Sequence, residues 1–203
     1  MNKELVISAS QEGTQIALLE DKQLVELHKE TNSNHYVIGD IFIGKVRKIM
    51  NGLNAAFIDV GDDKDGFAHY LDFGAQFNSV NKYLKLAMNG DSSMERLENF
   101  HNEPIFEKGG NLANCLKVGQ YVLTQVVKEP ISTKGPKLTG DISLAGHFLV
   151  LVPFSNKVSI SSKIRDKEEV KRLKRLIQSI RPENFGVIVR TAADGVSVAE
   201  LDS

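Results

Sequence analysis

The stretch Asn54-Ala-Ala-Phe57-Ile-Asp-Val-Gly61 is followed, after a polar turn, by Phe67-Ala-His69. Both runs are apolar, carry an aromatic residue and flank a turn rich in Asp and Gly, which is the pattern of a β-hairpin. Because side chains alternate between the two faces of a strand, Phe67 shares a face with His69. A sheet face that mixes aromatic with polar groups suits stacking on unpaired nucleic-acid bases, each of which offers a π-face. The same pattern also allows the side chains of Phe57 and Phe67 to be buried in a core.

Strand-like runs on both sides of the hairpin predict a small barrel. Residues 40–49 precede it, and residues 119–127 resume the strand pattern after a mixed stretch. Several short strands that close on themselves are typical of an OB-type barrel. The mixed stretch 71–115 contains scattered Gly and Pro, so we expect a long inserted loop there, the most mobile part of the chain, with short helices near residues 80–88 and 93–100.

The first residues predict a separate sheet. Residues 3–9, 14–20 and 23–28 read as strands joined by short polar turns, which indicates a three-stranded antiparallel meander. A polar, Asn-rich stretch at residues 30–35 follows, and we expect a boundary there.

The last third of the chain predicts a mixed α/β unit with one clear helix. Residues 146–152, 157–160 and 186–191 read as strands. Before the last of these, apolar residues recur at helical spacing, with Asp166 as the expected N-cap and Glu169 at the capping-box position. The outer face of this helix is basic and consists of Lys171, Arg172, Lys174 and Arg175. Such a face is more often solvated than bound to RNA, and the pattern leaves both interpretations open.

Composition argues against a protein that coats nucleic acid through charge alone. The 203 residues are 41% hydrophobic and 25% charged, with 25 Lys and Arg against 26 Asp and Glu. Any nucleic-acid site must therefore be local. Cys115 is the single cysteine, so neither an intrachain disulfide nor a CxxC zinc site exists. With no signal-peptide pattern and no long apolar run, we expect a cytoplasmic protein that does not enter a membrane.

No motif for catalysis or metal binding is found in the sequence. The chain has no Walker loop, no HExxH and no GxSxG, and its five histidines are scattered. The run Asp62-Asp-Lys-Asp-Gly66 loosely resembles a calcium loop, but Gly61 stands where the first ligand belongs, so we interpret it as a turn. We therefore predict no catalytic and no metal-binding residue here. The final residues carry no closing signal, and we expect the chain to be part of a longer protein.

Several segments together resemble the ribonuclease E/G family of single-strand-specific endoribonucleases. The resemblance runs over nearly the whole chain and is most specific at residues 142–153 and 189–191. The matching segments are Ile7-Ser-Ala-Ser10, Ile16-Ala-Leu18, Gly44-Lys-Val46, Ala55-Ala-Phe-Ile-Asp59, Gly66-Phe67, Ile142-Ser-Leu-Ala-Gly146, Leu149-Val-Leu-Val-Pro153 and Ile188-Val-Arg-Thr-Ala192.

The resemblance implies a β-rich α+β fold in three parts. Residues 1–35 would be the first part of an RNase H-like subdomain, and residues 36–138 an OB-fold domain of the ribosomal S-one type with the long insert 71–115. Residues 139–203 would be an incomplete 5′-sensor subdomain, mixed α/β. In the family, a later DNase I-like domain holds Mg through Asp residues, and a CPxCxGxG link binds Zn for oligomerisation. The resemblance therefore implies Mg, Zn and a homo-oligomer for a longer protein, with no ligand in these residues.

The resemblance also implies two binding sites. The RNA-binding positions of the OB domain fall on Phe57, Phe67, His69 and Lys134. The positions of the 5′-phosphate sensor fall on Gly146, Val150, Arg190 and Thr191. An Arg offers a fork of donors that matches phosphate oxygens, and a Thr hydroxyl adds another. Where relatives often have consecutive basic residues, this chain reads Ser161-Ser162-Lys163, which reduces the supporting charge.

Three functions are consistent with the sequence. The leading hypothesis is the RNA-binding, 5′-monophosphate-sensing part of an endoribonuclease that acts on ribosomal RNA precursors and messenger RNA, with single-stranded RNA as its partner. In that case this chain alone should not cleave RNA. The alternatives are a stand-alone RNA-binding adaptor without cleavage and a complete small nuclease with an unrecognised site.

Overall fold

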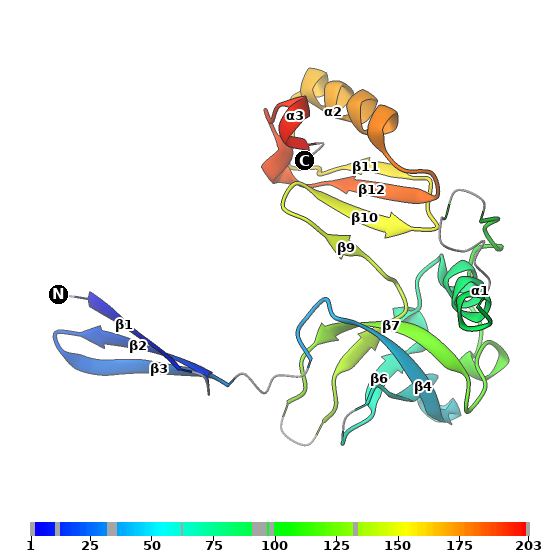
Figure 1. The fold of residues 1–203 in the computed structure, drawn as a ribbon, viewed down its shortest axis with the longest axis horizontal. Helices are drawn as coiled ribbons and strands as arrows, with labels where there is room; N and C mark the ends of the chain where they lie inside the picture. The colour runs from blue at the N-terminus through cyan, green and yellow to red at the C-terminus, as the bar shows by residue number, and fades with distance from the viewer. Residues whose placement is uncertain are drawn as a thin grey trace. The chain divides into compact units, whose positions relative to one another are not determined.

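A computed structural model describes residues 3–10, 13–31, 36–61, 63–90, 97, 100–131 and 134–201. The chain divides into two compact units, Met1–Val37 and Ile38–Ser203, and each is described by itself. Figure 1 shows the ribbon. The prediction of a β-rich α+β fold with a closed barrel is confirmed.

The first unit is the predicted three-stranded antiparallel meander. Its strands are β1 (Lys3–Ser10), β2 (Gly13–Glu20) and β3 (Gln23–Thr31), in the order β1-β2-β3. Asp21 and Lys22 have φ of 46° and 66°, the positive values that a two-residue hairpin turn needs to match the twist of its strands. All of β1 is solvent-exposed, including its apolar side chains.

The second unit contains a closed five-stranded barrel with the strand order β4-β5-β6-β8-β7. The strands are β4 (Ile41–Met50), β5 (Ala55–Asp59), β6 (Gly66–His69), β7 (Tyr121–Lys128) and β8 (Lys137–Thr139). All pairs are antiparallel except β6 and β8, which run parallel. Alternation decides what fills the barrel: Ala56 and Ile58 are fully buried, while Phe57 between them is not.

The segment 71–115 is packed against its surroundings. Its main element is α1 (Phe77–Met88), which confirms the helix expected near residues 80–88. The buried rings of Phe73 and Phe77 lie with centroids 4.6 Å apart, and Phe106 contacts Phe77 at 5.2 Å. Apart from α1 and short 3-10 helices, the described residues of this segment have no regular secondary structure, but their aromatic side chains are packed together. The second helix, expected at 93–100, falls mostly outside the described residues.

A four-stranded sheet with the order β11-β12-β10-β9 forms the rest of this unit. The strands are β9 (Leu144–Ala145), β10 (Leu149–Pro153), β11 (Val158–Ile160) and β12 (Phe185–Val189), and the helices are α2 (Lys167–Ile180) and α3 (Val198–Leu201). Leu173 and Ile177 of α2 pack on Val187 and Val189 of β12 in one buried cluster. Short 3-10 helices span Asn51–Leu53, Tyr70–Asp72, Leu112–Asn114 and Thr191–Ala193.

The ends of α2 were predicted in part. The Asp166 carboxylate accepts a hydrogen bond from the Glu168 amide at 2.9 Å, so the N-cap is confirmed. The capping box is wrong, because the Glu169 carboxylate instead accepts from the Arg172 guanidinium at 2.6 and 2.7 Å and from the Gly195 amide at 3.0 Å. Arg172 is consequently paired and half-buried, and it does not belong to the open basic face. Among the described residues, no helix is long and apolar enough to cross a membrane.

Candidate nucleic-acid interface

Phe57 and Phe67 lie directly opposite each other on β5 and β6. Their ring centroids are 5.7 Å apart with an interplanar angle of 68°, an edge-to-face arrangement. Both side chains are half-buried, while Ile58 and Ala68, one position further along each strand, fill the barrel. The two rings therefore point outward as a pair and leave part of their surface open.

A groove of about 760 Å³ lies over this pair. Its lining consists of Leu53, Phe57, Lys64, Asp65, Phe67, Lys134, Gly135 and Lys137. The groove thus combines two aromatic rings with three lysine side chains. This is the composition of a single-strand binding surface, where rings stack on bases and cations follow the phosphates.

The loop that carries Lys134 is tied to the groove by its backbone. Lys134 and Ile131 exchange two backbone hydrogen bonds at 2.9 and 3.2 Å, and the Phe67 amide donates to the Pro136 carbonyl at 2.9 Å. A Cβ at position 135 would collide with the carbonyl of Asp65, so this close contact between two turns requires Gly135. Residues 132 and 133 lie outside the described residues.

Strand register extends the site into a row across the barrel. Lys48 of β4 lies opposite Phe57, Phe57 opposite Phe67, and Phe67 opposite Lys137 of β8. Lys137 forms an ion pair with Asp72 at 3.0 Å, which fixes one end of the row. The row places a cation on each side of the two rings.

A second carboxylate beside the row, that of Asp59, also has a cationic partner. Asp59 accepts from the Gly61 amide and pairs with Arg47 at 2.6 Å, and these contacts hold the pKa of its carboxyl below the usual range. Asp59 therefore stays ionised, and its ion-pair partner is Arg47 and not Lys48.

His69 has a structural role next to the groove. Its Nδ1 accepts a hydrogen bond from the Leu71 amide at 3.1 Å, and its backbone amide donates to the Asp72 carboxylate at 2.9 Å. These bonds cap the 3-10 helix Tyr70–Asp72. The structure thus brings Phe57, Phe67 and Lys134 together, whereas His69 is not among the groove-lining residues.

Arg190 follows β12 and reaches back to the hairpin between β9 and β10. Its Nη1 donates to the Gly146 carbonyl at 2.7 Å, and its amide donates to the Phe148 carbonyl at 2.8 Å. The side chain is exposed, so the remaining guanidinium donors face solvent. A carbonyl 44 residues earlier in the sequence therefore holds one nitrogen of this guanidinium.

Thr191 lies beside a second hydroxyl. Its Oγ1 is 2.9 Å from Oγ of Ser161, which follows β11. The Ser161 Oγ also accepts from the Lys163 amide at 3.4 Å. The sequence identified Ser161 only as a departure from the family pattern, because its pairing with Thr191 depends on the parallel contact of β11 with β12.

Gly146 and Val150 have different surroundings. The Gly146 amide donates to the Leu149 carbonyl at 2.8 Å, so this amide closes the hairpin and its carbonyl serves Arg190. Val150 lies opposite Ile188 and lines a cavity of about 350 Å³ with Ser143 and Ser159. Gly146 follows β9, and Arg190 and Thr191 follow β12 beside it, whereas Val150 lines that separate hollow.

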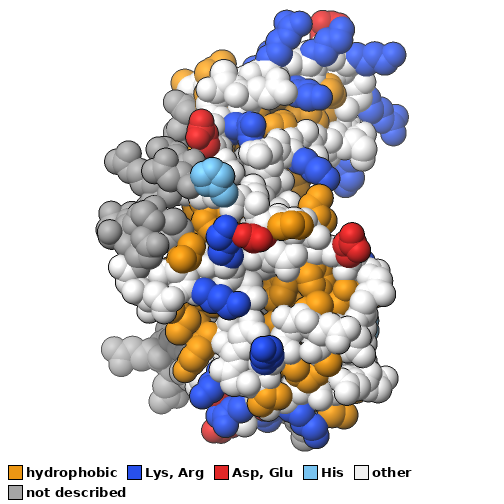
Figure 2. All heavy atoms as spheres, turned by 90° about the vertical axis from the view of Figure 1, so that its right-hand side faces the viewer, with side chains coloured by type: hydrophobic (Ala, Val, Ile, Leu, Met, Phe, Trp, Pro, Cys, Tyr) orange, Lys and Arg blue, Asp and Glu red, His pale blue; other side chains and the backbone are white. Residues whose placement is uncertain are grey.

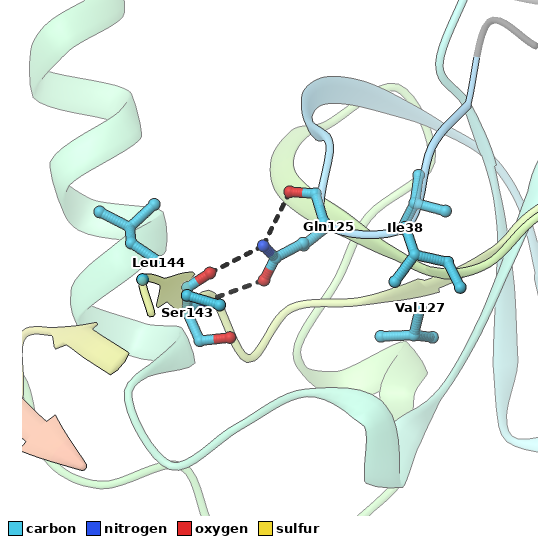
Figure 3. A pocket seen from close by; sticks show the side chains of 9 residues that line it. Ile38, Gln125, Val127, Ser143 and Leu144 are labelled. Carbon is cyan, nitrogen blue, oxygen red and sulfur yellow. Dashed lines mark hydrogen bonds between the residues drawn. The ribbon is translucent and has the colours of Figure 1, made fainter. Parts of the chain in front are cut away.

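Gly146 also lines a cavity of about 630 Å³ (Figure 3). Gln125 of β7 enters it and bonds Ser143 twice, accepting from its amide at 3.0 Å and donating to its carbonyl at 2.8 Å. The Gln125 amide group donates also to the Gly39 carbonyl at 2.8 Å. Gln125 therefore joins the barrel to the start of the β9 strand, and its polar atoms are already used.

No metal centre accompanies these features in the described part of the chain. There, no group of three or more His, Cys, Asp or Glu side chains lies close enough to hold an ion. The Glu169 carboxylate is held by Arg172 and the Gly195 amide, which lower its pKa to about 2. The pair of Glu169 and Arg172 stabilises the loop that follows Arg190, because Glu169 also binds the Gly195 amide of that loop.

Known proteins are similar to this chain in sequence. The model of the "Ribonuclease E/G family" matches residues 143–203. Ribonuclease G of Escherichia coli (strain K12) is 33% identical over all 203 residues, and ribonuclease E of a Nostoc species is 35% identical over 197 residues, or 96% of the chain. A ribonuclease E/G-like protein of Porphyra purpurea is 36% identical over 165 residues, or 80% of the chain. The chain spans 38%, 24% and 27% of these relatives' lengths, respectively. It belongs to the ribonuclease E/G family.

Proposed function

We propose that this chain is the RNA-binding and 5′-monophosphate-sensing portion of a single-strand-specific endoribonuclease that acts in ribosomal RNA processing and messenger RNA decay. The observation that carries the proposal is the outward pair Phe57 and Phe67, in register across β5 and β6 and bordered by lysines. In this reading, the barrel is an OB-fold domain, the meander is part of an RNase H-like subdomain, and residues 139–203 belong to a 5′-sensor subdomain.

The groove would bind RNA with little preference for sequence. A base stacked on an open ring gains roughly 1–3 kcal/mol, and every base has such a face. Lys64, Lys134 and Lys137 stand around the rings, where phosphates of a strand crossing the groove would lie. A duplex cannot present its stacked bases in this way, so the groove favours unpaired RNA.

Arg190 and Thr191 would read the terminal phosphate. The carbonyl of Gly146 holds one guanidinium nitrogen, which orients the remaining donors before RNA arrives. A charge-assisted pair of this kind contributes roughly 1.5–3 kcal/mol. The Thr191 hydroxyl, paired with Ser161, would offer a further donor. Gly146, Arg190 and Thr191 would together form a phosphate pocket. Where relatives are more basic, this chain has only Lys163, so discrimination by this pocket should be modest.

Hydrolysis is assigned to the part of the relatives that lies beyond the match. The family resemblance implies Mg for cleavage and Zn for oligomerisation in a longer protein. The described residues of this chain contain no cluster of carboxylates or thiolates that fits either ion. The chain's own residues bind and orient RNA.

The proposal is tested by measuring binding and cleavage together with the purified 203-residue chain. We expect it to bind single-stranded RNA better than duplex, to prefer a 5′-monophosphate over a 5′-hydroxyl, and to leave both intact in Mg²⁺. Mg²⁺-dependent cleavage by a clean preparation, abolished by a mutation within the chain, would contradict the division of labour and favour a small complete nuclease. Binding without any preference for the 5′-monophosphate would instead favour an RNA-binding adaptor.

A further inference from the structure

We propose that the outer face of α2 is a second RNA-contacting surface, which holds the phosphate backbone of a single strand whose 5′ end lies at Arg190. This surface, the α2 stripe, consists of Lys167, Lys171, Lys174 and Arg175. The inference rests on the proposed RNA function and adds to it a binding surface that neither the groove nor the phosphate pocket contains.

Charge is strongly segregated along the chain. The whole sequence is close to neutral, with 25 Lys and Arg against 26 Asp and Glu. Residues 157–190 alone hold ten Lys and Arg against four Asp and Glu. Figure 2 shows Lys and Arg side chains gathered at the top of the view, where α2 lies. A local positive field of this kind attracts a polyanion even when the net charge is negative.

The stripe follows from helical periodicity. Its residues recur at intervals of four, three and one, and all four side chains are exposed. The opposite side of α2 is buried through Leu173 and Ile177. At a rise of 1.5 Å per residue, the stripe covers about 12 Å of the helix axis. It is therefore a track along the helix and not a single anion site.

Most of this charge is available for a ligand. Lys171 pairs with Glu168 at 2.8 Å, but both side chains are more than half exposed, so the pair is weak. In the described residues, no carboxylate forms an ion pair with Lys167, Lys174 or Arg175. The other acid of the first turn, Glu169, is occupied by Arg172 and the Gly195 amide.

The stripe continues from the phosphate pocket along the chain. Ser161 contacts Thr191 at its hydroxyl and the Lys163 amide at 3.4 Å. Lys163 and Arg165 are exposed and lead into Lys167, the first residue of α2. Cations thus follow one another from the hydroxyl pair of the pocket to the helix, which suits a strand that leaves the pocket through its phosphates.

The structure favours RNA over a membrane or a protein partner. An interfacial membrane helix inserts its apolar face, but the apolar face of α2 is buried in the core with Leu173 and Ile177 almost inaccessible. Protein interfaces are anchored by buried aromatic or aliphatic side chains, and the exposed face of α2 presents none. A surface of exposed cations, with Glu168 as its one paired acid, fits phosphates.

The test compares two triple variants with the same change in charge. The first is Lys167→Gln, Lys171→Gln and Lys174→Gln, which keeps good helix formers in α2. The control is Lys85→Gln, Lys108→Gln and Lys117→Gln, three exposed lysines outside α2 and outside the groove. Both are titrated, beside wild type and Arg190→Ala, with a 5′-monophosphorylated and a 5′-hydroxyl oligouridylate at several salt concentrations. Circular dichroism checks that each variant is folded.

We expect the stripe variant to weaken binding of both RNAs roughly ten-fold at low salt and to reduce the slope of log Kd against log salt by about two, since each single-strand phosphate contact adds about 0.7. The ratio between the two RNAs should not change. The control triple should lose much less. Equal losses in the two triples, or an unchanged slope in the stripe variant, would overturn the inference.

The outcomes separate this inference from the proposed function. A stripe-dependent slope in a protein that shows no 5′-monophosphate preference would support the stripe and reject the sensor. A preserved preference for the 5′-monophosphate, with no effect of the stripe variant on the salt dependence of binding, would support the sensor and reject the stripe. Stripe-dependent binding to phosphatidylserine vesicles, with RNA binding unaffected, would reassign the surface to membranes and overturn the inference.

Discussion

The barrel groove and the proposed phosphate pocket around Arg190 are built in different ways, and the proposal gives each a different part of RNA to bind. The groove arises from strand register: Phe57 and Phe67 meet because β5 and β6 pair antiparallel after a short turn. The pocket arises from tertiary contacts, since Arg190 is fixed by Gly146 and Thr191 by Ser161, each from a distant segment. In the proposal, an open aromatic ring accepts any base, whereas an oriented guanidinium selects a phosphate.

This difference determines which substitutions matter at each place. On β5, the side chain of Phe57 points outward and that of Ile58 fills the barrel. A substitution of one should therefore affect mainly RNA binding, and a substitution of the other mainly stability. In the pocket, the binding side chain is exposed but its geometry depends on backbone carbonyls and a loop held by Glu169. The following predictions use these properties, starting from the largest expected effect.

Ile58→Ala should destabilise the second unit by about 2–5 kcal/mol, because it removes a fully buried side chain from the barrel and leaves a cavity. Urea unfolding with an unchanged slope measures this loss. Phe57→Ala, one residue earlier, is the matched control and should lose much less stability. If the two substitutions cost the same, Phe57 is a core residue and the groove does not exist as described.

Arg190→Ala should weaken binding of 5′-monophosphorylated RNA about ten-fold or more, since a charge-assisted bond is worth roughly 1.5–3 kcal/mol. Binding of 5′-hydroxyl RNA should change little, because it lacks the group that Arg190 contacts. Arg190→Lys should recover only part of the loss, as an ammonium cannot reproduce the fork. Titrations at one fixed salt concentration give these values. A uniform loss for both RNAs would make Arg190 a general backbone contact.

Phe57→Ala should weaken binding of single-stranded RNA about ten-fold, within the range of roughly 1–3 kcal/mol for one stacked base. The loss should be the same with either 5′ end, because the ring contacts a base and not the terminus. Phe57→Tyr retains an aromatic face and should bind nearly as wild type. Unchanged binding by Phe57→Ala would remove the groove from the interface.

Glu169→Gln should cost about 1 kcal/mol of stability at neutral pH, as expected for a partly exposed ion pair. The folded pKa of Glu169 is lowered from 4.5 to about 2, so its contribution is fully present above pH 4.5 and is lost as the pH falls toward 2. The difference in unfolding free energy between wild type and variant should therefore shrink over that interval. Glu168→Gln, on the exposed side of the same turn, controls for the change in helix charge, and an equal shrinkage there would contradict the assignment to Glu169.

The sequence predicted local elements better than their assembly. The meander, the barrel hairpin and the N-cap Asp166 follow from alternation, turn residues and capping chemistry, and all three are confirmed. The packing of residues 71–115 was not predicted, because the rings of Phe73, Phe77 and Phe106 come together only in the folded unit.

The same distinction applies to the candidate site. The aromatic hairpin was visible because both partners lie within one short segment. The positions of Lys48 and Lys137 beside the rings could not be predicted, because a bulge in β4 and the parallel pairing of β8 set their register. Ser161 and the anchoring carbonyl of Gly146 depend on contacts between segments, which no local pattern encodes. The misassigned partner of Glu169 has the same origin, because Gly195 meets it only in the folded unit.

The most direct test of the two-part interface is the ratio of Kd values for 5′-hydroxyl and 5′-monophosphorylated oligouridylate, measured for wild type, Phe57→Ala, Arg190→Ala and the double variant. We expect Arg190→Ala to bring the ratio to about one and Phe57→Ala to raise both Kd values without changing it, with additive losses in the double variant. A ratio that falls with Phe57→Ala, or survives Arg190→Ala, would contradict the division between a groove that reads bases and a pocket that reads the terminal phosphate.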